Sequence, residues 1–96
     1  MARVVVTAAA RGDLDELIRT HSLPADTGSR LARVLDPLAR FPRLGAELGG
    51  RFAGRRFILG PWRWMVIVYR WYDDRDLVAV LAIVDARSAG SPTAQR

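Results

Sequence analysis

Four arginines lie in or beside the most aromatic stretch of the chain, and their chemistry sets the first expectation. They are Arg55, Arg56, Arg63 and Arg87. A guanidinium group is planar, stays charged at every physiological pH and can bind a phosphate or a carboxylate through two parallel hydrogen bonds. We therefore expect these four side chains to bind the phosphate groups of a target.

Proton transfer needs a side chain that titrates, which arginine does not do near neutral pH. The candidates in the same stretch are Tyr69, Tyr72 and Asp85, and none has a diagnostic spacing. Tyr69 is the best placed, because it lies on the same predicted strand as Arg63. The alternative is that Tyr69 is a half-buried strand residue and that Asp85 forms an ion pair with a neighbouring arginine.

The chain has one histidine, His21, and no cysteine. His21 lies at the predicted end of a helix, where the helix dipole favours a cation, so we expect it to cap that helix. One histidine cannot supply the ligands of a transition-metal site. No glycine-rich loop followed by Lys-Ser or Lys-Thr is present to hold phosphate. We therefore expect neither a metal nor a cofactor.

Length and composition predict one folded domain. The chain has 96 residues, of which 50% are hydrophobic, and its net charge is +5 with an isoelectric point of about 11.2. A strongly basic chain attracts polyanions or an acidic protein partner. No apolar run is long enough to span a membrane, and the lack of cysteine fits a reducing compartment. We expect a cytoplasmic protein that does not enter membranes.

Hydrophobic periodicity predicts elements in the order β-α-α-β-β-β. They cover about residues 3–7, 11–21, 31–38, 52–59, 62–72 and 77–84. Three acidic residues, Asp13, Asp15 and Glu16, are expected near the start of the first helix, and Pro37 is expected to kink or restart the second. The order predicts an α+β domain, in which a helix hairpin packs on one face of a small, mainly antiparallel sheet.

The last two predicted strands are apolar on both faces. Strict alternation along the first of them puts Trp62, Trp64, Val66 and Val68 on one face and Met65, Ile67, Tyr69 and Trp71 on the other. The same alternation divides the last strand into Val78, Val80, Ala82 and Val84 against Leu77, Leu81 and Ile83. The helices of so short a chain can cover one face of a sheet, so we expect a partner on the helix hairpin or on the other face.

The order of motifs resembles the RelE/ParE superfamily, the toxins of type II toxin–antitoxin modules. The resemblance covers residues 4–88 and is carried by "DLDEL", "LARFPRLGAELGG", "GRRFILG", "VIVYRW" and a last strand followed by an arginine. It implies a single toxin domain over residues 1–88, whereas the polar composition of the last residues predicts a flexible tail over residues 89–96. It also implies a cognate acidic antitoxin as partner, in a hetero-oligomer.

Members of this superfamily act in one of two ways, as ribosome-dependent endoribonucleases on mRNA or as inhibitors of DNA gyrase. The nucleases combine basic residues of the central strands with an arginine at the end of the last strand, and many add a C-terminal tyrosine. By position Arg87 matches the last-strand arginine. Arg63 matches a central-strand residue if the alignment follows "WR", whereas an alignment on Tyr69 puts Val66 there.

No tyrosine, histidine or lysine follows Arg87. The sequence therefore predicts a toxin that arrests growth, with gyrase inhibition preferred over cleavage of ribosome-bound mRNA, and it leaves open whether the protein is an enzyme. The third alternative is a non-toxic, basic module that binds nucleic acid or has a structural role.

Overall fold

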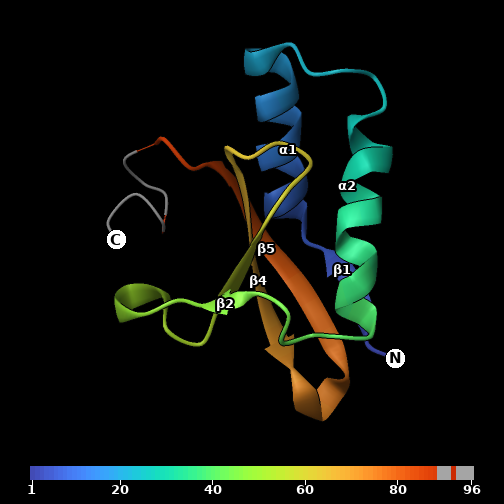
Figure 1. Ribbon diagram of the computed structural model, residues 1–96, viewed down its shortest axis with the longest axis vertical. Helices are drawn as coiled ribbons and strands as arrows, with labels where there is room; N and C mark the ends of the chain where they lie inside the picture. Colours follow the sequence, from blue (N-terminus) through green and yellow to red (C-terminus); the bar gives the residue numbers. More distant parts are fainter. Residues whose placement is uncertain (89–91, 93–96) are drawn as a thin grey trace.

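The computed structural model describes residues 1–88 and 92, so the predicted tail over residues 89–96 lies outside the described residues, apart from Pro92 (Figure 1). The helices and strands are β1 (Arg3–Val6), α1 (Ala8–His21), α2 (Thr27–Leu35), β2 (Ala46–Glu47), β3 (Arg56–Leu59), β4 (Met65–Tyr72) and β5 (Leu77–Asp85). The predicted α+β class is confirmed. The two-residue strand β2 was not predicted.

The strands form one mixed sheet in the order β1-β5-β4-β3-β2. β1 runs parallel to β5, and every other neighbouring pair is antiparallel. The two helices stand side by side over one face of this sheet (Figure 1), with α1 packed mainly on β5. Within the described residues, no helix is long and apolar enough to cross a membrane.

Helix α1 begins three residues earlier than the sequence predicted. Thr7 caps it, accepting a hydrogen bond from the Ala10 N–H at 3.2 Å and donating its own hydroxyl to the Val80 carbonyl at 2.8 Å. The predicted acidic first turn is therefore wrong. Asp13 lies further along the helix, where its carboxylate accepts the backbone N–H of Ile83 at 3.0 Å. Since β1 pairs with β5 no further than Val80, Asp13 supplies an acceptor that no strand provides there.

Pro37 restarts the chain as predicted. Helix α2 ends at Leu35, and a short 3₁₀ helix follows over Asp36–Ala39 with Pro37 near its beginning. Proline has no N–H to continue an α-helical ladder and is tolerated in a first turn. The second helical segment is therefore two short helices, which keep Leu31, Leu35 and Leu38 buried.

The pairing of β4 with β5 contains a β-bulge. Val68 pairs with Ala82, while the next residue of β4, Tyr69, pairs with Val80, so Leu81 has no residue opposite it. Side chains alternate between the two faces of a strand, and one extra residue reverses that alternation beyond it. The unbroken alternation of faces that was predicted for the last strand, β5, is therefore wrong.

The bulge decides which side chains of β5 face the helices. Before it, Val78 and Val80 belong to the core beneath α1 and α2, and after it Ile83 does. Residues at odd positions past the bulge thus point to the helical side. Asp85, two residues beyond Ile83, lies on this side as well, and its carboxylate contacts the end of α1.

The opposite face of the sheet carries a second, smaller apolar cluster. Val66 and Val68 are its centre, with 0% and 3% of their surface exposed, and Leu48 and Phe52 from the segment after β2 pack with them. The chain covers the middle of this face itself. That a partner binds on the helix hairpin or on this face stays a prediction, and the centre of this face needs no partner to cover it.

The loop between α2 and β2 is held to the sheet by Tyr69. The Tyr69 hydroxyl donates to the Pro42 carbonyl and accepts from the Gly45 N–H, both at 2.8 Å. A β-carbon on Gly45 would lie 2.5 Å from the Phe57 carbonyl oxygen and 2.8 Å from the Tyr69 ring, so glycine is required there. Tyr69 is 0% exposed, and burial raises the pKa of its hydroxyl.

We predict that Tyr69→Phe lowers the free energy of unfolding by about 1–3 kcal/mol, because the buried Gly45 N–H loses its acceptor. Urea denaturation measures the change. Tyr72→Phe, at a half-buried position at the end of β4, is the matched control and should change the free energy of unfolding by less than about 0.5 kcal/mol. Equal stability of wild type and Tyr69→Phe would contradict the structural role of this hydroxyl.

Candidate functional site

Three chain segments meet at one end of the molecule. They are the C-terminal end of α1, the turn between β3 and β4, and the C-terminal end of β5 (Figure 1). The predicted strand over 62–72 begins only at Met65. The residues before it form a turn, in which the Gly60 N–H donates to the Met65 carbonyl at 2.8 Å and the Met65 N–H donates to the Trp62 carbonyl at 3.0 Å. The turn brings its two tryptophans to the end of α1.

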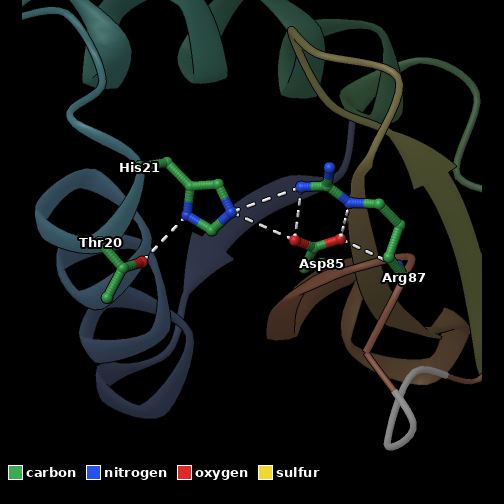
Figure 2. Close-up of polar contacts among 4 residues, drawn as sticks. All are labelled: Thr20, His21, Asp85 and Arg87. Carbon is green, nitrogen blue, oxygen red and sulfur yellow. Dashed lines mark hydrogen bonds and ion pairs between the residues drawn. The ribbon is translucent and has the colours of Figure 1, made fainter.

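A chain of polar contacts links two of these segments, the end of α1 and the end of β5 (Figure 2). The Asp85 carboxylate accepts two hydrogen bonds from the Arg87 guanidinium, from Nε at 2.9 Å and from Nη2 at 2.8 Å. His21 Nε2 lies 3.1 Å from the second Asp85 oxygen, and His21 Nδ1 lies 2.9 Å from the Thr20 hydroxyl. The predicted ion pair between Asp85 and an arginine is confirmed, and a histidine joins it.

Asp85 is ionised at neutral pH. Hydrogen bonds from the Arg87 guanidinium are the main reason that the pKa of this carboxyl lies well below its usual range, and the contact with His21 adds to the effect. An ionised carboxylate only accepts hydrogen bonds. When the imidazole is neutral, its proton therefore lies on Nε2, toward Asp85, and the lone pair lies on Nδ1, toward Thr20. The more distant Arg87 Nη2, 3.5 Å from Nε2, does not change this assignment.

Aromatic rings form the floor of the same site. The His21 ring stacks on Trp64 with 4.4 Å between centroids and 13° between planes, and Trp62 lies 6.3 Å further along. The Arg87 guanidinium carbon is 5.6 Å from the Trp64 ring centroid, and that of Arg30 is 5.7 Å from the Trp62 ring. Cations over aromatic faces are attracted by the ring quadrupole, so the two tryptophans hold an imidazole and two guanidinium groups together.

Three of the predicted site residues lie in this region, Arg63, Asp85 and Arg87. Arg87 is part of the contact chain, and Arg63 is exposed in the turn between Trp62 and Trp64. Arg56 instead donates to the Gly45 carbonyl at 2.8 Å and pairs with Glu47 at 2.9 Å. Arg56 lies opposite Tyr69 in the sheet, four residues along β4 from Met65.

Two further predicted residues also lie apart from the contact chain. Arg55 precedes β3, and its guanidinium donates to the Arg51 carbonyl at 3.5 Å. Tyr69 is buried beneath the 42–45 loop, with its hydroxyl engaged on both sides. We therefore do not retain Tyr69 as a candidate for proton transfer.

The prediction that His21 caps α1 is wrong. The His21 ring nitrogens contact Thr20 and Asp85, while the helix is ended by Ser22 in the left-handed conformation (φ 52°), so His21 does not cap α1. The signal was present in the helical period. His21 follows Leu14 by seven residues and Ile18 by three, which puts it on the stripe that packs against β5.

The described residues contain no group of three or more His, Cys, Asp or Glu side chains that could hold a metal ion. This arrangement of side chains supports acid–base chemistry and the binding of phosphate by arginine.

Comparison with known proteins gives a consistent result for the fold. No family model and no curated protein matches the chain. Among solved structures, a chain of the toxin–antitoxin complex RelBE2 from Mycobacterium tuberculosis is 28% identical with a TM-score of 0.60, over 88% of this chain and 96% of that one.

Two more structures are similar at lower identity. The chromosomal ParDE toxin–antitoxin system from P. aeruginosa gives 16% identity and a TM-score of 0.69, over 88% of this chain and 96% of that one. A conserved hypothetical protein from Helicobacter pylori gives 19% identity and a TM-score of 0.56, over 88% and 94%.

These likenesses, together with the helix hairpin on a mixed five-stranded sheet, define a fold shared with proteins of toxin–antitoxin systems. The 28% identity to the chain of the RelBE2 complex and the shared fold confirm the resemblance to the RelE/ParE superfamily of toxins that the motif order predicted.

We predict that Asp85→Asn lowers the free energy of unfolding at pH 7 by about 0.5–1 kcal/mol, the usual range for an ion pair near the surface. The folded-state pKa of Asp85 is depressed, so its contribution to stability is present above the unfolded value near pH 4 and is lost as the pH falls below it. Urea denaturation between pH 7 and pH 2.5 should show wild type and variant converging in acid.

The exposed turn residue Asp74 provides the control. Asp74→Asn should follow the wild-type curve closely at every pH. A gap between wild type and Asp85→Asn that stays constant down to pH 2.5 would mean that the ionised carboxylate is not what stabilises the end of β5.

Proposed function

We propose that this protein is the toxin of a type II toxin–antitoxin module, which arrests growth in the cytoplasm until a cognate acidic antitoxin binds it. The likeness to a chain of a toxin–antitoxin complex supports this proposal, and so does the net charge of +5. A basic surface attracts both an acidic antitoxin and a nucleic-acid target.

The groove between the two helices is the surface we assign to the antitoxin. It has a volume of about 460 Å³ and is lined mostly by apolar side chains, among them Val6, Leu14, Ile18, Leu31 and Leu35. An open apolar groove of this kind suits the apolar face of an amphipathic segment. The opposite face of the sheet is the less suitable surface, because its centre is already covered.

We further propose that the toxin cuts ribosome-bound mRNA. The observation that carries this proposal is the contact of His21 with Asp85 and Arg87. The preference for gyrase rested on the lack of a titratable side chain beside Arg87, and the imidazole removes that reason. Histidine is the side chain that ordinarily changes its charge between pH 5 and pH 8, which suits transfer of a proton at neutral pH.

Arginines and tryptophans of the site supply the other requirements of RNA cleavage. Asp85 occupies Nε and Nη2 of Arg87, and the remaining Nη1 points away from that pair (Figure 2), where it is free to bind a phosphate oxygen. Arg63 adds a second exposed charge. Trp64 contacts both His21 and Arg87 and so holds the two functional side chains beside each other.

Gyrase inhibition is the second candidate, and the Arg87–Asp85 pair favours it. A guanidinium that is already bidentate to a carboxylate stabilises less of the charge that develops on a phosphate in a transition state. A toxin that only holds a gyrase–DNA complex needs no such stabilisation. The two functions therefore differ in whether the residues at the end of β5 take part in a chemical reaction or only bind the target.

We predict that the purified protein cleaves mRNA in the A site of translating ribosomes, and that Arg63→Ala and Arg87→Ala each lower the cleavage rate by about 10–100-fold, since each removes a charge that binds phosphate. Primer extension measures the cleavage. Arg55→Ala, which lies outside the site, is the matched control and should cut within about twofold of the wild-type rate.

The same preparation is assayed for inhibition of gyrase supercoiling and for growth arrest with and without the antitoxin. Uncut mRNA together with inhibited supercoiling would establish the second candidate. Normal growth with soluble, folded toxin in the cell would overturn the proposal that it is a toxin.

A further inference from the structure

We propose that His21 Nδ1 is the atom that removes the proton from the attacking hydroxyl in RNA cleavage, and that Asp85 is the positioning residue that holds the imidazole for this task. The inference rests on the proposed nuclease function and specifies its proton acceptor. The acceptor comes from the end of α1, far in sequence from the C-terminal segment in which such a residue was sought.

The contacts of the ring define which nitrogen is available. Nε2 is directed at the ionised Asp85 carboxylate, 3.1 Å away, and carries the proton of the neutral imidazole. Nδ1 keeps its lone pair and faces the hydroxyl of Thr20, 2.9 Å away on the exposed side of the site. Thr20 is exposed, so its hydroxyl can rotate away, and a hydroxyl of a bound ribose can take its place.

The surroundings of the ring fix its orientation. Trp64 stacks on one face of it, and only 27% of the His21 side chain is exposed. The charged groups facing the ring from the packed elements are Asp85 and Arg87 at the end of β5, whose charges oppose each other, while the turn contributes Trp64 and α1 contributes Thr20. A ring held on three sides can present Nδ1 in one direction.

The reaction that this geometry supports is an internal transfer at phosphorus. Neutral His21 takes the proton of a ribose 2′-hydroxyl on Nδ1, and the 2′-oxygen forms a bond to the adjacent phosphorus. The bond from phosphorus to the 5′-oxygen of the next nucleotide breaks, and that oxygen leaves with the electron pair and takes a proton from water. The imidazolium returns its proton to the hydroxide so formed. The products carry a 2′,3′-cyclic phosphate and a 5′-hydroxyl.

Asp85 contributes by orientation and charge. Its carboxylate fixes the Nε2–H tautomer and stabilises the imidazolium that forms, as the carboxylate of a catalytic triad does for its histidine. Arg87 keeps this carboxylate ionised through the same two hydrogen bonds that hold it in place. The three residues therefore act as one unit, although two of them belong to β5 or its end and one to α1.

We test the inference with single-turnover cleavage of ribosome-bound mRNA by full-length toxin, measured between pH 5 and pH 9. His21→Ala should lower the rate constant by about 10²–10⁴-fold, the usual effect of losing a proton acceptor. The change leaves the face of Trp64 open, so added imidazole should restore a measurable part of the rate, and sodium chloride at equal ionic strength should not.

His21→Gln is the second variant, because its amide N–H can keep the contact with Asp85 and preserve the fold. It should cut as slowly as His21→Ala and lack the rise in rate between pH 5 and pH 7 that an ordinary imidazole gives when it acts as the proton acceptor. Asp85→Asn should lower the rate and shift that rise, and Arg19→Ala, an exposed residue of α1, should cut at the wild-type rate.

The outcomes separate the two proposals. If His21→Gln cleaves mRNA within about threefold of the wild-type rate and with the same pH profile, the proposed role of His21 is overturned. The nuclease function is then retained. The role of His21 is also overturned if imidazole does not restore cleavage by His21→Ala and the pH profile of His21→Gln is that of the wild type. The lower rate of His21→Ala would then be a structural effect. A wild-type protein that leaves mRNA uncut at every pH overturns both the nuclease function and the inference.

Discussion

The β-bulge at Leu81 is the constraint on which the candidate site depends. With an unbroken two-residue period, β5 would point Val78, Val80 and every later even-numbered residue toward the helices, and Asp85 would face the opposite side. The extra residue reverses the order, so that Ile83 and Asp85 face α1. Bulges reorient side chains in this way and occur near functional sites in many proteins.

Helix α1 is fixed to both sides of that bulge. Thr7 at its start donates to the Val80 carbonyl, and Asp13 in its second turn accepts the Ile83 N–H. These two contacts set the position of the helix along β5, and the helix length then brings His21 to the level of Asp85. The turn after β3 closes the site from the third direction, because Trp64 stacks on the imidazole. The site is thus a consequence of how one helix is attached to one strand.

Much of the fold could be predicted from the sequence, because the periodicity of the two helices and the β-branched runs are strong local signals. These signals predicted the α+β order, the restart of the helix at Pro37 and the alternation of side chains along β4 from Met65 onward. The bulge could not, since nothing local marks Leu81 as unpaired. Its existence depends on the registers of β4 and β1 against β5, which are long-range contacts.

The candidate site was predicted in part, for the same reason. Arg87 and Asp85 lie two residues apart in the sequence, so their ion pair could be predicted from local chemistry. The contact of His21 with Asp85 spans 64 positions in the sequence, and it depends on the bulge and on where α1 begins. Tyr69 was a reasonable candidate by residue type, yet its neighbour Gly45 lies so close that the hydroxyl is enclosed by the 42–45 loop.

The position of the proton on His21 tests the central claim most directly, and the chain has only one histidine to observe. Long-range ¹H–¹⁵N correlation spectra of the full-length protein at pH 8 distinguish the two neutral tautomers. The structure predicts a proton on Nε2 and a bare Nδ1, and a mixture of tautomers in Asp85→Asn. A proton on Nδ1 in the wild type, or a spectrum unchanged by Asp85→Asn, would contradict the placement of Asp85 against His21 on which the account depends.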